Sequence, residues 1–181
     1  MQAEHIAIAA GVGLIALVSA SIFEAATAIA SFVLGTAMLA ITVFDARAFR
    51  IPDAISIPMI PAGLLAAYTL GASSETLLEH AAYAAIAAAA FYGLNFAFRR
   101  IRGRDGLGLG DVKLVAVAGA WTGPGTAIVI LAAAVTAIAV VLLSAVRDGR
   151  EVTRDDAIPF GVFLAPAIWL VWCLQNTASV T

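Results

Sequence analysis

Seven apolar runs separated by short polar stretches make up most of this 181-residue sequence. They cover residues 6–22, 25–44, 54–70, 80–98, 111–122, 125–146 and 159–174. A helix that crosses the hydrocarbon core of a bilayer needs about 20 mostly apolar residues. The run 111–122 is the least secure because it is short. The pattern predicts an all-α fold, a polytopic helical membrane protein with about six to seven transmembrane helices.

The composition agrees with a membrane protein and excludes several other classes. Hydrophobic residues make up 62% of the chain and charged residues only 12%, whereas a soluble domain carries about 25% charged residues. A net charge of −2 offers no basic surface for nucleic acid. The single cysteine, Cys173, cannot form a disulfide framework or a cysteine-rich zinc module. We therefore expect the lipid bilayer as a partner and no nucleic acid.

The domain organisation is simple. The longest polar stretches, residues 99–110 and 147–157, are too short to fold alone, and there is no internal repeat. The first apolar run has no basic residue before it, so it resembles a retained helix more than a cleaved signal peptide. We expect residues 1–181 to form one integral membrane domain.

The basic residues predict how the chain is oriented. All ten fall into three loops: Arg47 and Arg50; Arg99, Arg100, Arg102, Arg104 and Lys113; Arg147, Arg150 and Arg154. Basic residues in short loops stay on the cytoplasmic side of a membrane. With seven spans, the N-terminus is then cytoplasmic and the C-terminus lies outside. The pattern leaves the oligomeric state open.

Two acidic residues stand at membrane boundaries on that same side. Asp45 ends one apolar run and Asp111 begins another. A carboxylate at such a depth is costly unless it faces a polar cavity, so each is a functional candidate. Helix capping would explain Asp111, because aspartate suits a helix N-terminus. It does not explain Asp45, which meets the unfavourable end of the helix dipole.

A glycine-rich stretch, residues 106–110, precedes Asp111. Irregular backbone at membrane depth is tolerated where it lines a cavity, so Gly108 and Gly110 fit a loop that delivers the aspartate to one. A phosphate-binding loop is disfavoured, because the Gly-Lys-Ser/Thr ending is absent and a carboxylate would repel phosphate.

Two carboxyl groups that face one water molecule can perform aspartic-protease chemistry. Such a pair shares a proton, because two like charges close together do not both ionise easily. One carboxylate then takes a proton from water, and its protonated partner polarises the scissile carbonyl. This chemistry requires no metal ion and no cofactor.

Three motifs resemble those of the type IV prepilin peptidases, a family of membrane aspartic proteases with a GxGD signature. They are Asp45 followed by Arg-Ile-Pro-Asp at 50–53, Gly-Leu-Gly-Asp-Val-Lys-Leu at 108–114, and Ile-Pro-Phe-Gly-Val-Phe-Leu-Ala at 158–165. The resemblance spans residues 45–165 and implies a GxGD protease-like helical bundle. It also implies that Asp45 and Asp111 cleave the leader from prepilin or pseudopilin precursors at the cytoplasmic face of the inner membrane.

The sequence departs from the family pattern at several points, of which Pro166 is a minor one. The cysteine-bearing domain that other members use for zinc binding and N-methylation is not found, so the chain is similar to the short peptidases of tight-adherence (Flp) pili and methylation is not expected. Asp53 replaces the usual asparagine and adds a third carboxylate. Val162 stands where some members have proline, a position expected not to touch the chemistry.

The resemblance leaves several alternatives open. Lys113 and Asp53 are candidates for contacting substrate or ordering the site, whereas Lys113 could also snorkel to the membrane interface. A presenilin-like protease would have tyrosine in place of Phe44 and a Pro-Ala-Leu motif that is not found. A small transporter or structural subunit would place its charges near the membrane midplane, whereas these acids lie at one face.

Overall fold

The computed structural model describes residues 2–71, 73–102, 108–149 and 159–178, and these residues form helices and no strands. The helices are α1 (Gln2–Ile22), α2 (Ala25–Ala48), α3 (Asp53–Gly71), α4 (Ser74–Arg102), α5 (Leu109–Thr122), a 3₁₀ turn η1 (Gly123–Gly125), α6 (Thr126–Asp148) and α7 (Gly161–Ala178). Each of the seven predicted apolar runs is a helix, so the all-α prediction is confirmed.

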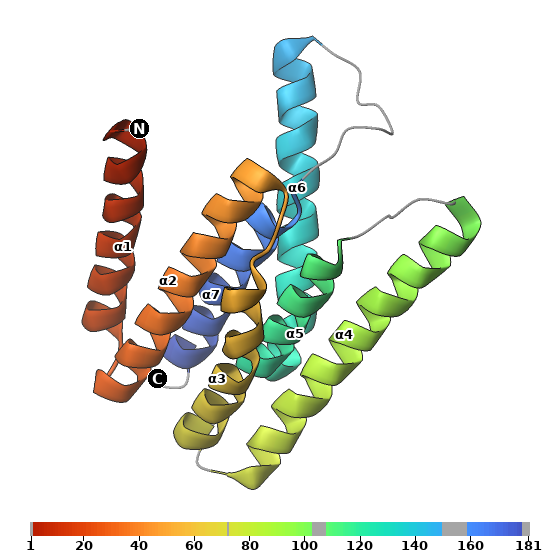
Figure 1. The fold of residues 1–181 in the computed structure, drawn as a ribbon. Helices are drawn as coiled ribbons and strands as arrows, with labels where there is room; N and C mark the ends of the chain where they lie inside the picture. The colour runs from red at the N-terminus through yellow and green to blue at the C-terminus, as the bar shows by residue number, and fades with distance from the viewer. Residues whose placement is uncertain (1, 72, 103–107, 150–158, 179–181) are drawn as a thin grey trace.

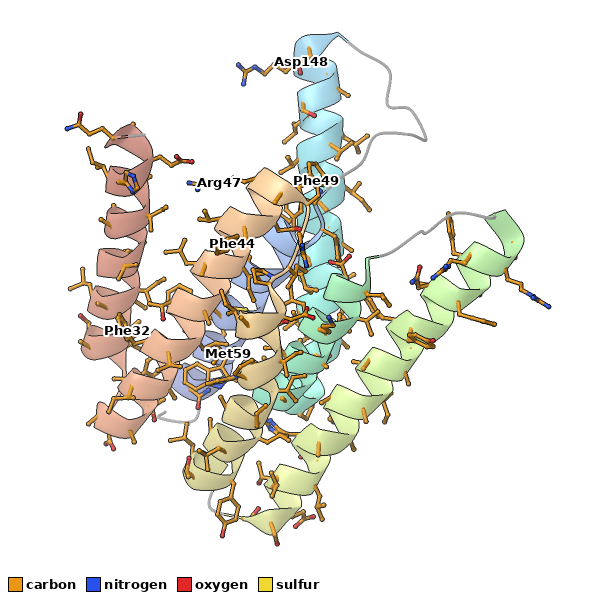
Figure 2. The ribbon with its side chains drawn as sticks, in the orientation of Figure 1. Phe32, Phe44, Arg47, Phe49, Met59 and Asp148 are labelled. Carbon is orange, nitrogen blue, oxygen red and sulfur yellow. The ribbon has the colours of Figure 1, made fainter. Side chains whose placement is uncertain are left out.

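Successive helices run in alternating directions through the bundle (Figure 1). The N-terminal ends of α1, α3, α5 and α7 and the C-terminal ends of α2, α4 and α6 therefore lie at one end, drawn uppermost, and the C-terminal end of α7 lies at the other. We call the first end the loop end of the bundle. The described basic residues fall there by their place in the helices, and Figure 2 shows Arg47 at this end. The predicted orientation, with the N-terminus cytoplasmic and the C-terminus outside, stays a prediction.

Helix α6 turns large apolar side chains outward and small ones toward the other helices. On α6, Leu131, Ile138 and Leu143 are exposed, whereas Ala133 and Ala137 are buried. Helices that associate in a membrane bury small residues and turn large apolar ones to lipid. Together with five apolar segments long enough to cross a bilayer, this pattern identifies a polytopic helical membrane protein.

The short helix α5 forms the centre of the core. Residues 114–122 are all buried, and α5 packs against α3, α4, α6 and α7. A helix of 14 residues is about 21 Å long, less than the ~30 Å hydrocarbon thickness. The expectation that residues 111–122 form a full span is therefore not met by length. Instead α5 and α6 form a hairpin around η1 (Figure 1).

Two buried serines join α1 and α2 at the end opposite the loop end. The hydroxyl of Ser19 donates to Ser31 at 2.8 Å. The indole N–H of Trp169 on α7 also donates to Ser31, at 3.2 Å. This polar cluster fixes α2 against α7 in an otherwise apolar region, and α2 and α7 both reach the candidate site described next.

Candidate active site

Asp45 lies in the last turns of α2 and is only 5% exposed. Its Oδ2 accepts a hydrogen bond from the backbone N–H of Val162 at 3.1 Å, and the N–H of Gly161 is directed to the same carboxylate. The first N–H groups of a helix have no partner within that helix. The N-terminal N–H groups of α7 therefore stabilise the carboxylate of Asp45. The dipole of α2 disfavours a negative charge there, because Asp45 lies at the C-terminal end of α2.

Asp111 is the third residue of α5, which begins just after Gly108. Its Oδ2 accepts the Gly108 N–H at 3.2 Å, and its own N–H donates to the Gly108 carbonyl at 3.0 Å. Asp111 therefore caps the start of α5, although from the third position of the helix, because Gly108 is the N-cap residue. Residues 106 and 107 of the glycine-rich stretch lie outside the described residues.

The two aspartates meet in one pocket of about 280 Å³ at the loop end. Their charges are close enough to interact. Side chains or backbone of three segments line this pocket, which we call the aspartate pocket: Asp45, Phe49, Arg50, Ile51, Asp53, Gly108, Leu109, Gly110, Asp111 and Lys113. All six residues that the sequence singled out for the site are therefore brought together.

Lys113 and Asp53, which the sequence analysis treated as separate candidates, pair with each other. The Nζ of Lys113 lies 2.6 Å from Oδ1 of Asp53 and donates a hydrogen bond to it. The contact joins the second turn of α5 to the first residue of α3. Lys113 therefore lines the aspartate pocket. This position favours a role in ordering the site over a role in which its ammonium group only extends to the membrane interface.

Sequence reasoning missed three features of the site. The N-terminus of α7 contacts Asp45 through backbone N–H groups, so the expectation that position 162 does not touch the site is corrected for its backbone. Ile51 is buried beside both aspartate-bearing segments. Phe49 ends α2 with a positive φ of 50°, and Figure 2 shows it at the loop end. Ile51, Gly161 and Val162 lie inside the quoted motifs, which marked their segments but not their contacts.

Metal-ligating groups do not gather in the part of the chain that the structure describes. No set of three or more His, Cys, Asp or Glu side chains there is arranged to hold a metal ion. Cys173 is half-buried on α7 and lies 3.8 Å from Oγ of Ser31. It belongs to the polar cluster between α1, α2 and α7, away from the aspartate pocket.

The fold and the site together define a class: a polytopic helical membrane protein with two carboxyl groups in one pocket at the end of its bundle. Residues 32–143 match the model of the type IV leader peptidase family. This match includes both Asp45 and Asp111, and it covers more than half of the chain. The chain belongs to the type IV leader peptidase family.

Relatives with curated names agree with this assignment. A prepilin leader peptidase/N-methyltransferase of Burkholderia pseudomallei (strain 1026b) is 36% identical over 140 residues, 76% of this chain and 44% of that protein. A protein of the same name from Pseudomonas aeruginosa is 33% identical over 149 residues, 78% of this chain and 49% of that protein. The chain spans about half the length of these relatives. No solved structure matches it significantly.

Proposed function

We propose that this protein is a membrane aspartic endopeptidase that removes the leader peptide from prepilin-like precursors. The observation that carries the proposal is the shared pocket of Asp45 and Asp111, which come from α2 and α5. Family membership and the names of the relatives support the substrate class. The basic residues at the loop end support a cytoplasmic site of cleavage in the inner membrane.

The proposed reaction uses the two carboxyl groups as a pair. A water molecule between them loses a proton to the ionised carboxylate and attacks the scissile carbonyl carbon. The protonated partner donates a hydrogen bond to the carbonyl oxygen as negative charge develops there. The proton taken from water is then passed to the leaving amine as the C–N bond breaks. Because the two groups titrate together, the acid and base roles belong to the pair.

The other residues of the aspartate pocket have supporting roles in this proposal. Gly108 fixes Asp111, because its N–H donates to Oδ2 of Asp111 and its carbonyl accepts from the Asp111 N–H. Gly110 lets the segment approach its neighbours closely. The Lys113–Asp53 ion pair orders the wall of the pocket between α3 and α5. Under this account Asp53 is not a catalytic residue, because its carboxylate is engaged by Lys113.

The test is cleavage of a precursor by the purified protein. The full chain in detergent micelles is incubated with a prepilin-like precursor, and the product mass is measured. We expect a product shortened by the leader alone. An intact precursor, or cuts scattered within the apolar helix as a presenilin-like enzyme would make, contradicts the proposal. Comparing Flp-type with other prepilin precursors tests the narrower prediction that Flp-type pilins are the substrates.

A further inference from the structure

Ile51 occupies an unusual place for an apolar residue beside a polar pocket. It lies in the short connection between α2 and α3, it is only 6% exposed, and it lines the aspartate pocket. Its neighbours are two glycines from different elements. Gly110 lies in the first turn of α5, and Gly161 is the first residue of α7.

The isoleucine side chain contacts both glycine backbones. A Cβ placed on Gly110 would lie 3.0 Å from Cβ of Ile51 and 3.3 Å from its Cδ1. A Cβ placed on Gly161 would lie 3.0 Å from the same Cδ1. Neither glycine therefore has room for a methyl group without movement, and Ile51 fills the space between the start of α5 and the start of α7.

Each of these helix starts holds one carboxyl group of the pair. Asp111 follows Gly110 directly in α5. Asp45 is hydrogen-bonded by the N–H of Val162, which follows Gly161 in α7. Ile51 therefore lies between the two helix starts that hold the carboxyl groups.

The residue is suited to act as a rigid spacer. Isoleucine is branched at Cβ, which restricts its χ1 angle. The following residue, Pro52, restricts the backbone of Ile51 to extended conformations. Both the backbone and the side chain of Ile51 are therefore conformationally restricted where it packs against the two glycine segments.

We propose that Ile51 is a positioning residue that sets the separation of Asp45 and Asp111. This inference rests on the proposed function, because the separation matters for a water molecule that both carboxyl groups must contact. Displacements well below 1 Å are enough to matter, since a misplacement of about 1 Å can cost about 100-fold in rate.

A matched pair of variants tests the inference. Ile51→Val removes the Cδ1 atom that contacts both glycines, and Ile168→Val removes the same atom from a fully buried residue of α7. We expect Ile51→Val to lower kcat about tenfold, with KM within about twofold of wild type. The Ile168→Val control should keep both values within about twofold of wild type, because it changes packing away from the pocket.

The pH profile of kcat distinguishes a change in the separation of the two carboxyl groups from a general loss of packing in the bundle. The interaction of two carboxyl groups sets how far apart their two titration steps lie. Ile51→Val should change the spacing between the acid and alkaline limbs, and Ile168→Val should leave it unchanged. If Ile51→Val keeps the wild-type kcat and pH profile, or if both variants behave alike, the inference is overturned.

The outcomes also distinguish this inference from the proposed function. If the wild type leaves precursors intact, or if both aspartates can be replaced without loss, the protease proposal itself fails. If cleavage depends on both aspartates but not on Ile51, only the positioning role fails.

Discussion

The carboxylate of Asp45 accepts a hydrogen bond from the backbone N–H of Val162, which is 117 residues further along the chain. This contact joins the C-terminal end of α2 to the N-terminal end of α7. An aspartate at the end of its own helix is electrostatically disfavoured, and the first N–H groups of α7, which have no partner within that helix, offset that cost. The fold therefore holds Asp45 in a polar environment at the edge of the bundle.

Two substitutions at the start of α7 should differ strongly in effect. Val162→Pro removes one N–H donor to Asp45, but proline fits the first turn of a helix and the Gly161 N–H remains. We expect activity within about tenfold of wild type, the scale of one hydrogen bond. Gly161→Ala places a methyl group 2.7 Å from Oδ2 of Asp45 and should abolish cleavage. Equal losses in an initial-rate assay would refute this account of the contact.

Loss of the Lys113–Asp53 ion pair should lower the cleavage activity only modestly. Its side chains are 34% and 59% exposed, and exposed ion pairs contribute about 0–1 kcal/mol. Asp53→Asn and Lys113→Met should each keep most of the cleavage activity, measured as the initial rate of leader removal. A loss with Asp53→Asn as large as that of a catalytic aspartate would show that Asp53, not Asp45, belongs to the reacting pair.

Phe49 should carry backbone strain that glycine relieves. Its φ of 50° places it in the left-handed region, which costs a residue with a side chain about 1–2 kcal/mol. Phe49→Gly should therefore be more stable than Phe49→Ala by about 1 kcal/mol, because both lose the ring and only alanine keeps the strain. Chemical denaturation in detergent checks this difference, and equal stability of the two variants would argue against strain at this position.

Ser31 should stabilise the packing of α1 and α7 on α2. It is fully buried and accepts hydrogen bonds from Ser19 and Trp169. Ser31→Ala leaves both donors without this acceptor and should lower the free energy of unfolding by about 1–2 kcal/mol. Thr36→Ala is the control, because the Thr36 hydroxyl donates to the Phe32 and Val33 carbonyls of its own helix. Similar unfolding curves for the two variants would contradict the prediction.

The sequence predicted the two candidate catalytic residues correctly as pocket residues, because a charged group at a membrane boundary costs free energy. Asp45 and Asp111 could be selected because a carboxylate at a membrane boundary needs a reason to be there, and both line the aspartate pocket. The helical runs were visible from their apolar length, although α2 continues to Ala48, beyond the predicted end at residue 44, because Ala and Arg are good helix formers.

The rest of the site could not be predicted, because its determinants are not distinctive residue types. The donors to Asp45 are backbone N–H groups, which every residue but proline carries. Ile51 is one apolar residue among many, and only the packing of α5 and α7 around it reveals its position. The Lys113–Asp53 contact spans 60 residues, and no local pattern links the two.

The measurement that tests the central claim most directly is the mass of a co-expressed prepilin-like precursor with Asp45→Asn and, separately, Asp111→Asn. Each variant removes one ionisable carboxyl group at nearly unchanged size and leaves the helical bundle inserted in the membrane. We predict that the wild type yields a precursor shortened by its leader, whereas each single variant leaves the precursor at full mass. A shortened product from either inserted variant would contradict the claim that the two aspartates act as a catalytic pair.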